Sequence, residues 1–293
     1  MKNNICKWAF ISIAFFSACT GQTKNSISKC KQIAPAKYAT LLIDRNEEGK
    51  FVPGDFDPYL GPAAMDLDSS GNIYLLNADN TIQKFDKLGK KIWSMLHSSQ
   101  QLDIKVFKNE LFSFDGRCII LHDIDNGKVN DSIIIQIDKK DYTPIGNVSK
   151  FYGKKLFISK WFITREKELV YVFDLEKRQV SSRVPEGINL FPITKCQACS
   201  LAFVEKLFKS KDEFFINESE EYIAYFNSNS NNVFIFNKQN GKIQKFCNLP
   251  QEISTLTIRF ATFSSKNELV LCTIKMVDFE PKSLVFYKLK ITI

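Results

Sequence analysis

Histidine is scarce in this sequence, and several familiar catalytic motifs are missing. The 293 residues include two histidines, His97 and His122. A metal site built from three histidines is therefore excluded, because the chain cannot supply the third ligand. The sequence also lacks a Walker loop, a G-x-S-x-G nucleophile elbow and an H-E-x-x-H motif, so it carries no local signature of these hydrolases.

The chain also lacks an apolar run that is long enough to span a membrane. Its N-terminal run, Trp8–Phe16, has nine residues and is interrupted by Ser12, whereas a membrane-spanning helix needs about 20. Lys2 and Lys7 lie before this run, and small residues follow it. A basic start, a short apolar stretch and small residues are typical of an export signal. We therefore predict a signal peptide over residues 1–18.

The end of this signal resembles the lipobox of bacterial lipoproteins, in which a cysteine is lipidated and becomes the new N-terminus. The stretch in question is Phe16-Ser17-Ala18-Cys19, and Phe16 stands where the family usually has Leu. The resemblance implies that Cys19 carries the lipid. Residues 19–36 are small and polar at their start, which predicts a flexible tether between the membrane and a folded domain at residues 37–293. Surface lipoproteins of Bacteroidota often have an acidic run after the cysteine; its absence here favours the outer membrane and a periplasm-facing protein.

Glycine and proline are few, at 12 and 9 residues, whereas phenylalanine occurs 26 times and 44% of residues are hydrophobic. This composition predicts a packed core rather than a disordered chain. The formal net charge is +8, but the lysines are dispersed along the sequence. Because no basic run is present in a chain predicted to be exported, we expect no nucleic-acid partner.

Six cysteines remain after the signal peptide and Cys19 are set aside. An even number in an oxidising compartment permits disulfides without specifying their pairing. Cys118 and Cys272 lie in apolar strand patterns and are expected to be buried thiols. Cys196 and Cys199 form the one close pair, which predicts a local disulfide or two plain thiols; a redox site is the alternative.

One stretch determines the predicted fold. Residues 62–95 alternate short apolar strands with turns rich in Asp, Asn and Gly: PAAMDLDSSGNIYLLNADNTIQKFDKLGKKIWSM. Four antiparallel strands in about 35 residues make one blade of a β-propeller. The stretch resembles a repeat of the NHL type in two segments, D-x-D-x-x-G-N-I-Y and I-Q-K-F-D-x-x-G-K. No helix periodicity appears after the signal peptide, so the predicted fold class is all-β.

The signal that opens the second strand of this blade recurs along the chain. Equivalent positions are Asn72, Asn109, Lys154, Glu220 and Asn267, at spacings of 37, 45, 66 and 47 residues. These spacings fit blades of about 40–50 residues apart from one long interval, residues 185–211, which is either a decorated loop or a degenerate blade. Tyr38–Ile43 is a strand without a blade of its own, and we expect it to pair beside the C-terminal strands and close the ring. The chain is similar to the six-bladed propeller lipoproteins of Bacteroidota, so we expect six blades, with five as the alternative.

Candidate site residues are of two kinds. Asp66 and Asp68 begin a stretch that looks like a calcium loop. Its twelfth position is Asn77, where a calcium loop of the EF-hand type needs a bidentate Glu. A turn between two strands explains the same residues without a metal ion. Tyr59, Trp161 and Phe162 are aromatic residues in loops, which could contribute to a binding face or to the core. We expect a lipid-anchored, non-enzymatic binding or scaffolding module without a resident cofactor, which binds an envelope protein, peptide or glycan. The alternative is a metal-dependent hydrolase or lyase with its site in the propeller channel.

Overall fold

The computed structural model describes a β-propeller. The described residues are 36–42, 62–77, 79–135, 147–160, 170–182, 197–198, 203, 213–247, 249–250, 253, 258–264, 267–278 and 280–293. They form twenty strands in five antiparallel sheets of four strands each. No helix among them is long and apolar enough to cross a membrane.

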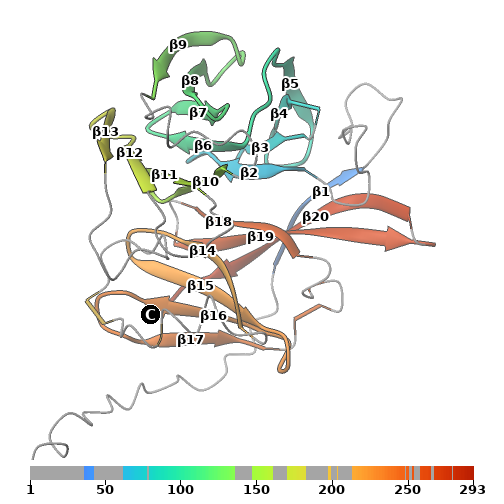
Figure 1. The fold of residues 1–293 in the computed structure, drawn as a ribbon. Helices are drawn as coiled ribbons and strands as arrows, with labels where there is room; N and C mark the ends of the chain where they lie inside the picture. Colours follow the sequence, from blue (N-terminus) through green and yellow to red (C-terminus); the bar gives the residue numbers. More distant parts are fainter. Residues whose placement is uncertain are drawn as a thin grey trace, which may run out of the picture.

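Each sheet is one blade, and four of the five blades are built from consecutive strands (Figure 1). From the innermost strand outward, the blades are as follows. Blade 1 has β2 (Ala64–Leu67), β3 (Ile73–Leu76), β4 (Thr81–Phe85) and β5 (Lys91–Leu96); blade 2 has β6 (Asp103–Phe107), β7 (Glu110–Phe114), β8 (Cys118–Asp123) and β9 (Val129–Ile134); blade 3 has β10 (Asn147–Tyr152), β11 (Lys155–Lys160), β12 (Val170–Asp174) and β13 (Gln179–Ser182). Blade 4 has β14 (Glu213–Glu218), β15 (Tyr222–Asn227), β16 (Asn232–Asn237) and β17 (Ile243–Phe246); blade 5 has β18 (Ile258–Ser264), β19 (Glu268–Val277), β20 (Glu280–Lys290) and, outermost, β1 (Ala36–Leu42).

The fifth blade closes the ring. β1 pairs antiparallel with β20, from Ala36 opposite Lys288 to Leu42 opposite Ser283. The start of the chain therefore supplies the outermost strand of the last blade, and the neighbouring β2 begins the first blade. This pairing confirms the closing strand predicted at residues 38–43, and it covers an edge of β20 that would otherwise be exposed.

The blades are joined by apolar clusters between their facing sides. Between blades 5 and 1, for example, Phe286 and Cys272 pack with Phe85 and Ile73, all of them fully buried. Other clusters join blades 1 and 2, 2 and 3, and 4 and 5. Most of the buried side chains belong to the first three strands of each blade, because the outermost strands face solvent on one side: β5 alternates between half-buried and exposed residues.

Asp and Asn residues set the turn between the third and fourth strands of a blade. In blade 1, Asp86 Oδ1 accepts the backbone N–H groups of Leu88 at 2.8 Å and Lys90 at 2.9 Å. Asp123, Asp174 and Asn237 make the same kind of bond in blades 2, 3 and 4. A side chain that bonds its own backbone two residues on stabilises a turn locally, which is why the Asp and Asn signals were readable in the sequence.

The prediction of an all-β propeller is confirmed, and the described residues form five blades, the alternative count. The five equivalent positions Asn72, Asn109, Lys154, Glu220 and Asn267 each lie just before the second strand of a blade. The expectation of six blades left open whether the long interval was a decorated loop or a degenerate blade. Most of that interval lies outside the described residues, but Phe203 within it stacks on Phe236 of blade 4, with ring centroids 4.6 Å apart.

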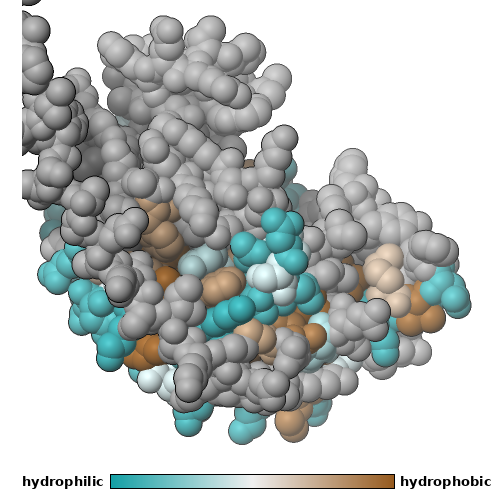
Figure 2. Space-filling model, turned by 90° about the horizontal axis from the view of Figure 1, so that it is seen from below, coloured by the Kyte–Doolittle hydropathy of each residue, from teal (hydrophilic) through white to brown (hydrophobic). Residues whose placement is uncertain are grey.

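The view from below shows hydrophilic and hydrophobic residues intermixed over the described part of that surface (Figure 2). Single exposed apolar side chains are normal on a protein surface. The described part of this face therefore shows no continuous apolar patch.

The junction of blades 1 and 2 offers a test of the packing. Gly127 has φ of +77°, and a Cβ atom there would lie 3.0 Å from the Trp93 ring, whose Nε1 donates to Ile124 O. Gly153 has φ of +54° but nothing within 4 Å. We expect Gly127→Ala to lower the free energy of unfolding by about 2–4 kcal/mol, through backbone strain plus displacement of Trp93, and Gly153→Ala by about 1 kcal/mol, through strain alone. Urea denaturation of both variants measures this; equal losses would show that Trp93 yields freely.

Candidate functional site

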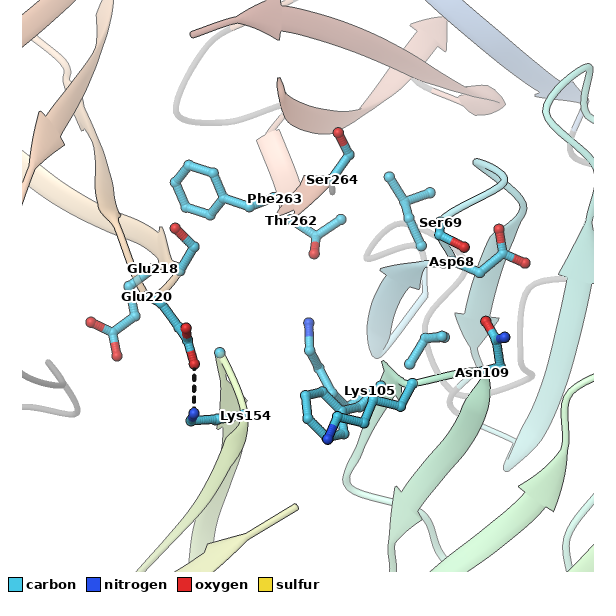
Figure 3. A pocket seen from close by; sticks show the side chains of 16 residues that line it. Asp68, Ser69, Lys105, Asn109, Lys154, Glu218, Glu220, Thr262, Phe263 and Ser264 are labelled. Carbon is cyan, nitrogen blue, oxygen red and sulfur yellow. Dashed lines mark ion pairs between the residues drawn. The ribbon is translucent and has the colours of Figure 1, made fainter. Parts of the chain in front are cut away.

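A cavity of about 470 Å³ opens at one end of the central channel. All five blades contribute to it through the same element, the hairpin between the innermost strand and the second strand. The lining residues come from 67–69, 105–109, 153–154, 218–220 and 262–264. Figure 3 shows Asp68, Ser69 and Asn109 on one side of the cavity and Glu218, Glu220 and Lys154 on the other, with Thr262 and Ser264 from β18 between them. We call this cavity the mouth pocket.

The buried carboxylate of Asp66 joins three blades next to the mouth pocket. Its Oδ2 accepts the backbone N–H of Val106 at 2.7 Å and pairs with Lys105 Nζ at 2.9 Å, both in blade 2. Its Oδ1 accepts the hydroxyl of Thr262 in blade 5 at 2.6 Å. Asp66 itself is in β2 of blade 1 and is 2% exposed. A buried carboxylate with this many partners is stabilised, whereas the loss of one partner would leave a costly unpaired charge.

Polar side chains join other innermost strands in the same way. Asp103 Oδ2 in β6 accepts the backbone N–H of Phe151 in β10 at 2.6 Å. Asn217 Nδ2 in β14 donates to Ala261 O in β18 at 2.6 Å. These bonds run sideways from blade to blade, and they satisfy backbone groups that the strand ladders leave unpaired. The wall of the channel is therefore a polar, internally bonded ring.

Charges alternate in sign along the rim of the mouth pocket. Lys108 Nζ lies 2.8 Å from one oxygen of Glu176, and Lys154 Nζ lies 3.1 Å from the other. Lys154 Nζ also pairs with Glu220 at 2.9 Å, which links blades 3 and 4. The two ammonium groups lower the pKa of Glu176 to about 2, and hydrogen bonds to Glu220 and Glu176 raise the pKa of Lys154. We call these four residues the rim chain; their side chains are 36–65% exposed.

A second ion pair behind the rim is buried. Lys238 Nζ lies 2.8 Å from Glu218, with side-chain exposures of 1% and 0%, and it also donates to Ser219 O. Burial lowers the pKa of Lys238, against the opposing effect of Glu218. This pair holds the hairpin that carries Glu220, so the acidic end of the rim chain is fixed by the core of blade 4.

The two aspartates predicted as calcium ligands are both engaged with protein donors. Asp68 accepts the backbone N–H groups of Ser70 and Asn72 at 2.9 Å each, and its Oδ2 accepts the Asn72 side-chain amide at 2.7 Å and the Tyr74 hydroxyl at 3.1 Å. Asp66 belongs to the channel wall. Within the described ranges, no group of three or more His, Cys, Asp or Glu side chains is placed to hold a metal ion. The turn accounts for Asp68, and calcium binding by these residues stays a prediction.

The other predicted site residues lie outside the part of the chain that the structure describes: Cys19, Tyr59, Trp161, Phe162, Cys196 and Cys199. The residues of the rim chain were not among the predictions. A signal for two of them was present, because Lys154 and Glu220 are among the five positions aligned before each second strand, as is Asn109 of the pocket wall. Equivalent positions in the blades of a propeller meet around one end of the channel.

Comparisons with known proteins give a likeness of shape alone. No family model matches the sequence, and no curated protein matches it. Among solved structures, BamB from Moraxella catarrhalis matches 87% of this chain and 100% of its own, with 9% identity and a TM-score of 0.35. A Bacteroides fragilis protein inferred to be exported matches 90% of this chain and 98% of its own, with 10% identity and a TM-score of 0.47. A chain of a nidogen–laminin complex matches 75% of this chain and 94% of its own, with 14% identity and a TM-score of 0.41. We draw no functional conclusion from matches this distant.

Both histidines lie at the junction of blades 1 and 2. Their rings are in edge contact, with centroids 4.8 Å apart, and His122 Nε2 lies 2.8 Å from Ser113 Oγ. His122 is 1% exposed. Burial, with a smaller contribution from His97, lowers the pKa of His122 to about 4. The arrangement keeps a neutral imidazole inside the junction.

A pH dependence follows from this burial. Between pH 6.5 and about 4 the unfolded chain takes up a proton on this histidine that the folded chain does not, so stability falls as the pH falls. The loss is up to about 1.4 kcal/mol per pH unit, or about 3 kcal/mol over the window. Urea denaturation from pH 7 to 4 should show this slope in the native chain and a clearly shallower one in His122→Gln, where the remaining slope includes that of His97, whose pKa burial also lowers. Parallel curves for the two proteins would contradict the assignment.

Asp66 supplies a second prediction. Asp66→Asn removes the charge that pairs with Lys105 but keeps the size of the side chain, and we expect a loss of about 3–5 kcal/mol in the free energy of unfolding. Asp86→Asn is the matched control, because asparagine also makes the turn bonds of Asp86, and it should change stability by less than about 0.5 kcal/mol. Similar small losses in both variants would mean that Asp66 does not hold the blades together.

The cysteines supply a third prediction. Cys118 and Cys272 are thiols and not part of a disulfide, as expected, although Cys118 is only half-buried. Cys247, which follows β17, is disulfide-bonded. Ala198, between Cys196 and Cys199, donates its N–H to Lys238 O in the same blade at 3.0 Å. We therefore expect peptide mapping without reduction to find Cys247 linked to Cys196 or Cys199; a link to Cys30, or a local Cys196–Cys199 bond, would contradict this.

Proposed function

We propose that the protein is a lipid-anchored binding module of the cell envelope, and that the mouth pocket is its binding site. The observation that carries the proposal is the convergence of five equivalent hairpins on one cavity of about 470 Å³. A pocket of a few hundred cubic ångströms with convergent polar groups is the default place for a ligand. The proposed anchor is Cys19, on the strength of its resemblance to a lipobox.

The chemistry of the pocket favours binding over catalysis. The lysines and glutamates of the pocket wall named above are held in ion pairs with other protein groups, whereas Asp68 accepts hydrogen bonds within its own turn. Thr262 donates its hydroxyl to Asp66. Such paired groups can exchange partners with a ligand. None of them is positioned as a nucleophile beside a general base. The function is therefore to hold an envelope component at the mouth of the channel.

Site-specific photocrosslinking in cells tests this proposal. A photoreactive residue replaces Ser69, an exposed residue of the mouth pocket, or Ser98, an exposed residue that follows β5 at the other end of blade 1. We expect a reproducible adduct, identified by mass spectrometry, from position 69 and not from position 98. A Cys19→Ala version of the first variant should lose the adduct if anchoring brings the partner within reach.

Two outcomes would contradict the proposal. Equal adducts from positions 69 and 98 would mean that the mouth pocket has no special role in binding. No adduct from position 69, in a chain shown by mass spectrometry to be lipidated, would mean that the envelope component does not bind there.

A further inference from the structure

The chain enters the propeller on the face that carries the mouth pocket. A row of paired residues crosses blade 5 from the channel outward. Thr262, which lines the pocket, is opposite Val270; Val270 is opposite Lys288; and Lys288 is opposite Ala36. Ala36 begins β1, which then runs away from the mouth toward the opposite face. Ala36, the first described residue, therefore lies at the level of the pocket.

The proposed anchor lies close to this point along the chain. Cys19 precedes Ala36 by 17 residues, and a flexible chain of that length has an average reach of about 22 Å. A blade strand of five or six residues is about 17–20 Å long, which sets the thickness of the ring. A tether that had to pass the ring to reach a membrane on its far side would use most of that reach. A membrane on the near side requires no such detour.

The rim chain has the charge pattern of a zwitterion. Two lysines and two glutamates alternate along it, so that the net charge is zero. Such a rim gains little from the long-range field of an anionic surface. It is complementary to a ligand that carries one phosphate and one ammonium group a short distance apart.

We infer that the mouth of the propeller lies against the membrane that holds the lipid anchor, and that the rim chain binds the phosphoethanolamine headgroup of a phospholipid. The inference rests on the proposed anchoring at Cys19. It names a membrane headgroup as the component that the mouth pocket holds.

The rim chain offers a position for each charge of this headgroup. The phosphate takes the place of the Glu176 carboxylate, which two ammonium groups already approach at 2.8 and 3.1 Å. The headgroup ammonium pairs with Glu220, which is 65% exposed. Exposed ion pairs contribute little to stability, so the rearrangement of the rim costs little.

Hydrogen exchange on vesicles tests the inference. The full-length lipidated protein is placed in vesicles of phosphatidylethanolamine with phosphatidylglycerol, or of phosphatidylglycerol alone. We expect exchange in the mouth turns at 68–71, 107–110 and 219–222 to slow by about fivefold or more in the first vesicles only. The opposite turns, at 79–80, 115–117 and 228–231, should be unchanged in both. Slowing at the opposite turns, or no difference between the two compositions, would overturn the inference.

A matched pair of variants tests the role of the rim chain. Glu220→Gln removes the acidic end of the chain and should abolish the slowing, whereas Glu221→Gln, at the exposed neighbouring residue, should keep it. Equal behaviour of the two would overturn the assignment to the rim chain. The same slowing in detergent with soluble phosphoethanolamine would show a soluble ligand and overturn the membrane contact.

Vesicle flotation separates this inference from the proposed anchor. If the native chain floats with vesicles and Cys19→Ala does not, the anchor stands, and unprotected mouth turns then count against the headgroup contact alone. If the native chain fails to float, the proposed anchor itself is wrong.

Discussion

The pairing of β1 with β20 is the contact on which the rest of the structure depends. Blades 1 to 5 follow one another along the chain, so a ring forms only if the end of the chain is tied back to its beginning. Here the outermost strand of blade 5 precedes the first strand of blade 1 in sequence. Closure brings β18 beside β2, and only then can Thr262 reach Asp66 and the five hairpins meet around one pocket.

The channel and the rim use charge in different ways. Inside, Asp66 and the Glu218–Lys238 pair are buried and have protein partners, which fixes the positions of the hairpins. At the rim, the four residues of the rim chain are exposed, and each of their bonds contributes little to stability. The buried pairs thus build a rigid frame, and the exposed pairs remain free to exchange partners with a ligand. That division suits a site that binds rather than one that transforms its ligand.

Much of the fold could be predicted because its signals are local. The strands of blade 1 and the turns at Asp68 and Asp86 depend on residues a few positions apart, so the sequence shows them directly. The closing strand was predictable because it had no neighbouring strand to pair with. The blade count was not, because the sequence left open whether residues 185–211 are a decorated loop or a degenerate blade. The packing of Phe203, within this interval, on Phe236 of blade 4 is a long-range contact that no local pattern shows.

The site was harder to predict than the fold for the same physical reason. The four residues of the rim chain come from three blades, and no single spacing in the sequence links all of them. Asp66 was singled out for a calcium-loop pattern and not as a link between blades, because its partners Val106 and Thr262 are 40 and 196 residues away. Alignment of the blades at their second strands places three of the pocket residues at equivalent positions, and this was the available signal.

The most direct test of the closed ring compares two truncated chains. One begins at Ala36 and keeps β1; the other begins at Asp44 and lacks it; both lack the signal peptide and Cys19. We expect the longer chain to unfold in one cooperative transition in urea, and the shorter one to unfold at a much lower urea concentration or not to fold. Equal midpoints for the two chains would show that the ring closes without β1, which contradicts its dependence on the β1–β20 pairing.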